Sequence, residues 1–206
     1  MSPEIMTKTT AIENFWQWFG QNEELLFQLS PESPEVRSWV DRIHEKLQSI
    51  DSHLGCEISL RPGPKRDFFL SAGGIEEGFP WVEALYATAP QFTRWNIVKF
   101  KQRKGRAGII QIHGLTFSDD NVFFRMFADG GKIGIHLFFA EFDPHLFQVF
   151  GEVGFIFLDS LLGEFEVATK VGDIDFRALE ESDRKELRPL TELSAAFDHW
   201  HERMAA

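Results

Sequence analysis

Residues 121–142, NVFFRMFADGGKIGIHLFFAEF, decide the fold of the region around them. Two apolar runs flank Asp129-Gly130-Gly131, and a glycine-rich turn between such runs predicts a β-hairpin. The register is the same for a two-residue and a four-residue loop, because both loops have the same centre. On one face it pairs Ala128 with Ile133, Met126 with Ile135 and Phe124 with Leu137. This face is apolar throughout and is predicted to belong to the core.

The opposite face of the hairpin carries the candidate ligand site. There the register places Arg125 beside His136, among the aromatic side chains Phe123, Phe127 and Phe138. Arg125 is predicted to bind an anionic group. Its charge disfavours protonation of His136, which leaves that ring able to act as a base or a hydrogen-bond partner. The alternative is a half-exposed sheet face on which Arg125 stacks over a phenylalanine and reaches a carboxylate.

Two helices are predicted before the sheet. Residues 11–29 have apolar positions on two faces, which indicates a helix packed between other elements. In the next segment Ser33 and Pro34 match the start of a helix, and its apolar positions recur at spacings of three and four as far as Gly55. The two helices are expected to form an antiparallel N-terminal pair over residues 11–54.

Strands and further helices are predicted for the rest of the chain. Strands are expected at residues 56–61 and 66–72, joined by Pro62-Gly63-Pro64, at 94–103, in short pieces near 108–117, and at 164–171 and 173–179. Helices are expected at residues 80–89, at 144–162 between the N-cap Asp143 and the terminator Gly163, and at 190–204. The helix at 144–162 is apolar almost all round, so it is expected to lie deep in the fold.

The order of these elements predicts the fold class. Helices are inserted between runs of strands rather than alternating strictly with them, which favours an α+β fold with a largely antiparallel sheet covered by helices. One domain is predicted for residues 1–206, comprising the helical pair (11–54), the sheet with inserted helices (55–178) and a charged loop with the C-terminal helix (179–206). A domain of this length can bury about 70% of the surface that its unfolded chain exposes.

Composition limits the class of protein. The 206 residues include 22 Phe and 6 Trp, which predicts a large aromatic core, and the net charge is −11. Nucleic acid is an unlikely partner for so acidic a chain, since duplex affinity depends on neutralising phosphates. The single Cys56 excludes an intramolecular disulfide. Neither an uninterrupted apolar run of roughly 18 residues nor a leader pattern is present, so a cytoplasmic location without membrane contact is expected.

The positive charges gather in one segment. Residues 84–118 contain no Asp or Glu, and the basic patch within them consists of Lys99, Lys101, Arg103, Lys104 and Arg106. The predicted strand places the first three of these side chains on one pleat face. The patch is a candidate contact for phosphate or for an acidic partner, and the alternative is a solvated hairpin end that balances an acidic body.

Motifs of common enzyme classes are missing from the sequence. There is no G-x-S-x-G turn and no H-E-x-x-H, and GGIEEGF at residues 73–79 fits neither a phosphate-binding loop nor a dinucleotide fingerprint. Glu164 with Glu166, and Asp173 with Asp175, are attributed to exposed strand faces rather than to a metal site. No cofactor and no metal are expected, and a binding protein is favoured over an enzyme.

Three segments carry a family resemblance: FWQWFGQNEELL (15–26), GGIEEGFPWVEALYATAPQFTRWNIVKFKQR (73–103) and GFIFLDSLLGEFEVATKVGDIDF (154–176). In these motifs the chain resembles a family of uncharacterised bacterial cytosolic proteins, a domain of unknown function. The likeness covers most of residues 13–178. It implies a bacterial origin and one α+β domain, and it brings neither an established activity nor catalytic residues. The tail from Glu180 lies beyond it.

Two functional hypotheses follow. The first is a non-enzymatic binding or protein-interaction domain. Its versions are a homodimer through the N-terminal helices, a regulatory protein, and an immunity-like protein whose acidic surface neutralises a basic partner. The second is an enzyme or a small-ligand-binding protein that uses the Arg125/His136 face for an anionic ligand. An open, concave face at these two residues favours the second hypothesis, and a covered face favours the first.

Overall fold

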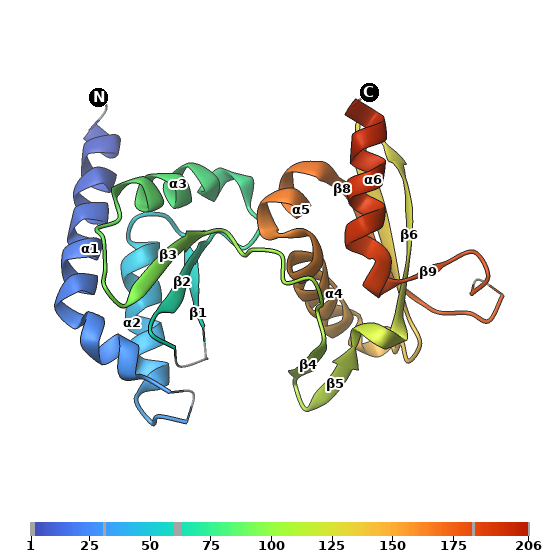
Figure 1. The fold of residues 1–206 in the computed structure, drawn as a ribbon, viewed down its shortest axis with the longest axis horizontal. Helices are drawn as coiled ribbons and strands as arrows, with labels where there is room; N and C mark the ends of the chain where they lie inside the picture. The colour runs from blue at the N-terminus through green and yellow to red at the C-terminus, as the bar shows by residue number, and fades with distance from the viewer. Residues whose placement is uncertain (1–2, 31, 60–62, 183, 206) are drawn as a thin grey trace. The chain divides into compact units, whose positions relative to one another are not determined.

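Two compact units make up the chain, Met1–Lys101 and Gln102–Ala206, and each contains its own sheet (Figure 1). The computed structural model describes residues 3–30, 32–59, 63–182 and 184–205. Its helices and largely antiparallel strand pairs confirm the predicted α+β class. The division into units does not decide whether residues 1–206 form one domain, which stays a prediction.

The first unit begins with the predicted helical pair, α1 (Pro3–Gln28) and α2 (Val36–Gln48). Aromatic side chains pack the pair onto the sheet. The Phe19 ring of α1 contacts the rings of Phe68 and Trp95, with centroids 5.0 and 5.4 Å away. The predicted aromatic core is therefore present in this unit.

Both predicted ends of α2 are wrong. The Ser33 hydroxyl does not cap the helix, because it accepts a hydrogen bond from the Ser30 N–H at 3.1 Å, and the helix starts after Glu35. Ile50 and Leu54 lie beyond the end of the helix but are 2% exposed. The spacing of these two residues predicts that they are buried. They are buried in the turn that follows α2, where the helical hydrogen bonds have already ended.

The sheet of the first unit has the order β1-β2-β3. β1 (Gly55–Ile58) and β2 (Arg66–Ser71) form the predicted antiparallel hairpin, and Pro62 of the predicted turn lies outside the described residues. The chain then passes through α3 (Phe79–Thr88), close to its predicted position, and β3 (Trp95–Lys99) pairs parallel to β2. A parallel neighbour requires such a crossover, which the prediction of a largely antiparallel sheet did not include.

β3 is shorter than the predicted strand at 94–103. Phe100 follows it with a φ of 59°, a left-handed conformation that ends the strand geometry. This conformation is held by burial, since the residue is 3% exposed, and by a 2.7 Å hydrogen bond from its N–H to the Leu70 carbonyl. The basic residues after Phe100 therefore do not continue the pleat of Lys99, contrary to the prediction.

A buried arginine fixes the end of α1 to the sheet. Arg66 is 6% exposed, and its guanidinium donates to the carbonyl oxygens of Leu26 at 3.2 Å, Phe27 at 2.9 Å, Leu29 at 2.8 Å and Ser59 at 3.0 Å. The last carbonyls of a helix have no partners within the helix, so this side chain satisfies them. Burial lowers the pKa of Arg66.

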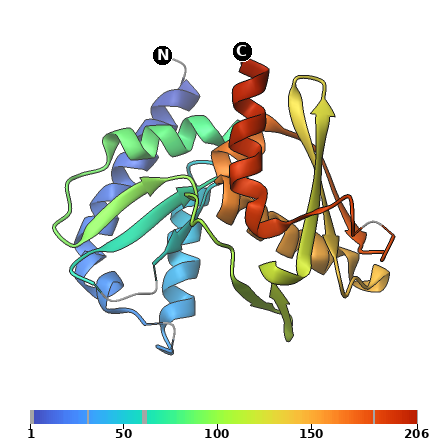
Figure 2. The ribbon, with the colours of Figure 1, turned by 45° about the vertical axis from the view of Figure 1, so that its right-hand side comes forward.

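The main sheet of the second unit has the order β8-β7-β6-β9 (Figure 2). Its strands are β6 (Val122–Asp129), β7 (Lys132–Phe139), β8 (Val171–Ala178) and β9 (Arg188–Pro189). A separate hairpin, predicted near 108–117, consists of β4 (Ile109–Ile112) and β5 (Leu115–Ser118). The β6–β7 register matches the prediction, with Arg125 opposite His136.

The helices of this unit are α4 (Phe147–Leu162), α5 (Glu164–Lys170) and α6 (Leu193–Ala205), with short 3-10 turns before α4 (Pro144–Leu146) and α6 (Leu190–Glu192). The predicted strand at 164–171 is wrong. Gly163, with a φ of 87°, ends α4 as predicted, and α5 starts directly after it. Glu164 and Val167 are buried three residues apart, which fits the period of a helix and not the alternation of a strand. The side chains of Glu164 and Glu166 therefore do not lie on a strand.

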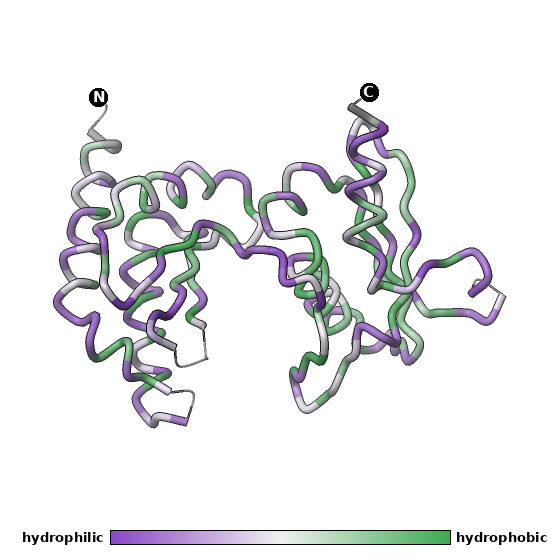
Figure 3. Tube along the Cα trace, viewed as in Figure 1, coloured by the Kyte–Doolittle hydropathy of each residue, from purple (hydrophilic) through white to green (hydrophobic). Residues whose placement is uncertain are grey.

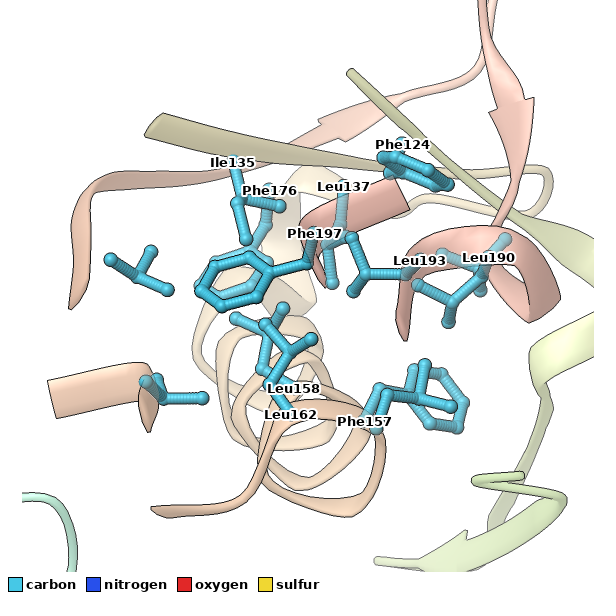
Figure 4. Close-up of a cluster of buried hydrophobic side chains, with 14 of the residues drawn as sticks. Phe124, Ile135, Leu137, Phe157, Leu158, Leu162, Phe176, Leu190, Leu193 and Phe197 are labelled. Atoms are coloured by element: carbon cyan, nitrogen blue, oxygen red, sulfur yellow. The ribbon is translucent and has the colours of Figure 1, made fainter. Parts of the chain in front are cut away.

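α4 and α6 cover one face of the main sheet (Figure 4). The core residues between them include Phe157, Leu158 and Leu162 of α4, Phe197 of α6, and Phe124, Ile135 and Leu137 of the hairpin. The hairpin face predicted to be core is therefore buried along most of its length, and Ala128 near the turn is exposed.

α4 was predicted to lie deep in the fold, and half of its residues are buried, but part of its apolar surface is exposed. Its Phe147 and Phe155 side chains are 51% and 47% exposed. In the described part of the chain, Pro144–Leu162 is long and apolar enough to cross a membrane by length and composition alone (Figure 3). The core helix of a folded unit has the same character, so this is weak evidence for a span, and the absence of membrane contact stays a prediction.

The two units share one order of elements. In each, an antiparallel hairpin is followed by a helical crossover and by a strand that pairs parallel to the second hairpin strand. β2 and β7 are therefore central strands with neighbours on both sides. Among the described residues, β6, the first strand of its hairpin, has only the two-residue β9 on its outer side.

Candidate functional site

The outer face of the β6–β7 hairpin carries the five predicted site residues, Phe123, Arg125, Phe127, His136 and Phe138. The Phe127 ring packs edge-on against His136, with centroids 4.8 Å apart. It also covers Gly134, where an added Cβ would lie 2.3 Å from the ring. The space beside Gly134 is thus filled by Phe127.

The hydrogen-bond partner of His136 comes from the neighbouring strand β8. Its Nε2 lies 2.7 Å from Asp173 Oδ2, and the side chain is 12% exposed. A carboxylate only accepts hydrogen bonds, so Nε2 carries a proton, and in the neutral ring Nδ1 is left as an acceptor. The prediction from the hairpin alone named Arg125 as the neighbour of His136 and missed this carboxylate.

Asp175 is the register neighbour of His136 on β8. Burial acts to raise the pKa of this carboxyl, but hydrogen bonds from the Arg177 side chain and the Phe176 N–H outweigh burial and lower it. Arg177 Nε donates to Asp175 Oδ2 at 2.6 Å. The row across the sheet is therefore Asp175, His136 and Arg125, an acid, an imidazole and a guanidinium.

Arg125 makes two contacts on this face. Its guanidinium carbon lies 5.7 Å from the centroid of the Phe138 ring, and Nη2 donates to Glu186 Oε2 at 3.4 Å. Phe138 is 3% exposed, and Arg184 lies over Phe123, so part of the outer face is covered. Stacking and carboxylate pairing are the contacts named in the alternative interpretation. Arg125 nevertheless remains 40% exposed, and its use as a ligand site stays a prediction.

The cavity that Arg125 lines is at the outer edge of β6. It is a groove of about 550 Å³ between β6 and α6, called the β6–α6 groove below. Its lining residues are Phe124, Arg125 and Met126 of β6, Glu186 and Arg188, and Ala196, His199, Trp200 and Arg203 of α6. β6 and α6 run side by side, with the C-terminal end of α6 near the hairpin turn (Figures 1 and 2). The volume is in the range of small-ligand sites.

Arginines outnumber acidic residues in the lining of this groove. The lining residues include Arg125, Arg188 and Arg203 and one acidic residue, Glu186, which pairs with Arg125. Arg188 also pairs with Glu192 at 2.8 Å, whereas Arg203 forms no ion pair within the described residues. The groove therefore differs in sign from the whole chain, whose net charge is −11.

The part of the groove on α6 was missed from the sequence, although a signal for it exists. Ala196, His199, Trp200 and Arg203 have the spacing i, i+3, i+4 and i+7, so they share one face of a helix. This spacing identifies one face of α6 but not the element that lies opposite this face. That α6 and Arg125 line the same groove depends on packing between segments that are distant in the sequence.

The predicted basic patch is divided between the units, with Lys99 and Lys101 in the first and Arg103, Lys104 and Arg106 in the second. Four of these side chains pair with carboxylates of their own unit: Lys99 with Glu83, Lys101 with Glu57, Arg103 with Asp198, and Arg106 with Asp119. Their charge is therefore partly balanced within the fold. Contact with phosphate or with an acidic partner stays a prediction for this patch.

A second cavity, of about 290 Å³, is formed by β5 and the start of α4. Its walls include Phe117, Phe139 and Phe150, and its polar lining includes Glu141 and Asp143. The Asp143 side chain accepts the His145 N–H at 2.9 Å, which is the predicted N-cap role. None of the predicted site residues lines this cavity.

No group of three or more His, Cys, Asp or Glu side chains among the described residues is placed to hold a metal ion. Comparison with known proteins gives no match to a family model, to a curated protein or to a solved structure. The resemblance to a bacterial family therefore stays a prediction.

Proposed function

We propose that this chain is a non-enzymatic binding domain whose β6–α6 groove takes an anionic group joined to an apolar one. The observation that carries the proposal is that Arg125, Arg188 and Arg203 line one groove together with Met126 and Trp200, in a chain of net charge −11. Guanidinium groups bind carboxylates and phosphates through paired, charge-assisted hydrogen bonds. The side chains of Met126 and Trp200 suit the attached apolar group.

The chemistry of the lining favours binding over catalysis. The nine lining residues in the described part of the chain include no Ser, Thr, Cys, Lys or Tyr, so no side-chain hydroxyl, thiol or amine nucleophile stands beside the guanidinium groups. The pair His136–Asp173 is not part of the lining. Recognition of an anion needs only the groups that the groove presents.

Trp200 provides a local reporter for the test, since it is the one tryptophan among residues 102–206. Protein labelled with 5-fluorotryptophan would be titrated with phenyl phosphate, and with benzyl alcohol as the neutral analogue, while 19F NMR spectra are recorded. Trp200→Phe assigns the signal. We expect phenyl phosphate to shift the Trp200 signal and benzyl alcohol to leave it in place.

Matched arginine variants make the test specific. Arg125→Ala and Arg203→Ala should each weaken the response about tenfold or more, because a hydrogen bond to a charged group contributes about 1.5–3 kcal/mol. Arg177→Ala is the control, since Arg177 pairs with Asp175 and does not line the groove. Equal titrations for wild type and Arg125→Ala, or equal shifts of all tryptophan signals, would contradict the proposal.

A further inference from the structure

We infer that the outer edge of β6 accepts an extended acidic segment of a partner protein as an added strand. The inference rests on the proposed function, because it assigns the anionic ligand of the β6–α6 groove to a peptide. The groove is bordered by a sheet edge as well as by guanidinium groups. A small anion would use only the guanidinium groups, whereas a peptide in β conformation would use both.

In the part of the chain that the structure describes, β6 has a full-length neighbour on one side only. β7 pairs with it from Val122 to Asp129, whereas β9 pairs only with Phe123 and Phe124. From Met126 onward, no strand in the described part of the chain lies on the outer side of β6. Alternate residues of such an edge direct their N–H and C=O groups away from the sheet, and an added backbone can bind these groups.

The β6–α6 groove borders the start of this free edge, at Met126. Residues 126–129 extend about 14 Å at about 3.4 Å per residue, so four residues of an added segment can pair with them. β9 already lies on this edge and runs antiparallel to β6. An added antiparallel segment would therefore lie on the same edge as β9, on the side toward the hairpin turn.

The alternation of side chains along β6 indicates which kind of peptide segment can bind at its edge. Along β6, Arg125 shares the outer face with His136, whereas Met126 belongs to the opposite face and borders the groove with Trp200 of α6. The side chains of an added strand alternate between the same two sides. Acidic residues suit the side of Arg125, away from Asp129 at the end of the strand, and apolar residues suit the side of Trp200. The edge therefore fits a sequence in which acidic and apolar residues alternate.

Charge disfavours a second copy of this chain as the occupant. Pairing two β6 edges would bring the arginines of two equivalent grooves together, and like charges on neighbouring strands are destabilising. The arginines that line the groove therefore oppose self-association and favour an acidic partner.

The test uses the 206-residue chain and the fluorescein-labelled peptide Glu-Val-Glu-Val-Glu-Val, measured by fluorescence anisotropy. Two further peptides carry N-methyl groups, one on all glutamates and one on all valines. In an added strand only alternate N–H groups face β6. We expect one methylated peptide to lose at least tenfold in affinity and the other to stay within about twofold of the unmodified peptide. Arg125→Ala should weaken binding, and Arg177→Ala should not.

The outcomes separate this inference from the proposed function. If both methylated peptides bind like the unmodified one, or if no peptide binds while phenyl phosphate still shifts the Trp200 signal, strand addition is wrong and anion binding stands. If neither peptide nor phenyl phosphate binds, both ideas fail. Sedimentation velocity that shows a dimer insensitive to the peptide would assign the edge to a second copy and overturn the inference.

Discussion

Gly154 of α4 is predicted to tolerate no side chain, whereas Gly151, one turn earlier, is predicted to gain stability from one. A Cβ on Gly154 would lie 2.0 Å from the Phe176 ring, and a Cβ on Gly151 would lie 3.6 Å from the same ring. Phe176 is 7% exposed and belongs to the core of the second unit, so its ring has little room to move (Figure 4). The two alanine variants therefore probe one ring at two distances.

The expected magnitudes follow from helix propensity and packing. Neither glycine has a positive φ, so alanine favours the helix by about 1 kcal/mol at both positions. At Gly151 the methyl group makes an ordinary contact, and the free energy of unfolding should rise by about 0.5–1 kcal/mol. At Gly154 overpacking costs about 3 kcal/mol, the upper end of its range, because the contact is far inside van der Waals distance. The net loss there is about 2 kcal/mol.

Thermal unfolding followed by the 19F signal of Trp200 reports on the second unit. A change of 1 kcal/mol shifts Tm by about 2–4 °C in a chain of this size, so Gly154→Ala should lower Tm by about 4–8 °C and Gly151→Ala should raise it slightly. Gly151→Ala is the matched control for the loss of a glycine from α4. Equal Tm values for the two variants would refute the packing argument.

Three further predictions concern buried polar groups. Arg66→Met should lower the free energy of unfolding by about 3 kcal/mol in urea titrations, since it leaves the carbonyl oxygens at the end of α1 without their donor; a loss below about 1 kcal/mol would contradict this role. Burial and the charge of Glu57 raise the pKa of Cys56 to about 12, so reaction of the native protein with a disulfide reagent at pH 8 should be at least about a hundredfold slower than reaction in urea. For Asp119, burial acts to raise the pKa, but hydrogen bonds from Arg106 and the Gly108 N–H outweigh it and hold the pKa below the usual 3.8. The stability from this carboxylate is present above its unfolded pKa and is lost as the pH falls through the lower, folded pKa. The excess stability of wild type over Asp119→Asn should therefore shrink below about pH 4, and a constant difference down to pH 2 would count against it.

The β6–β7 hairpin could be predicted from sequence because its determinants are local. A glycine-rich turn fixes the centre of the hairpin, and period-two alternation of apolar residues fixes which side chains share a face. α3 and the cap at Asp143 also follow from neighbouring residues, through proline and an Asx side chain at the helix start. In these segments the local preference and the final fold agree.

The boundaries of other elements depend on packing. Residues 164–170 resemble a strand, yet Gly163 allows a turn of the chain that buries Glu164 and Val167 on one helical face. β3 ends where burial of Phe100 holds a left-handed residue in place. The parallel partners of β2 and β7 arrive only after helical crossovers, whose return to the same sheet no short segment specifies.

The sequence by itself determined the α+β class, the hairpin register and the position of Arg125 beside His136 on the outer face. Only the tertiary structure decided that Asp173 binds His136 and that Arg125 lines a groove with Arg188, Trp200 and Arg203. The physical reason is that α6 is placed by burial of Phe197 and its neighbours in a shared core, not by any interaction local to the hairpin. Local sequence sets which face a side chain occupies, and long-range burial sets what that face meets.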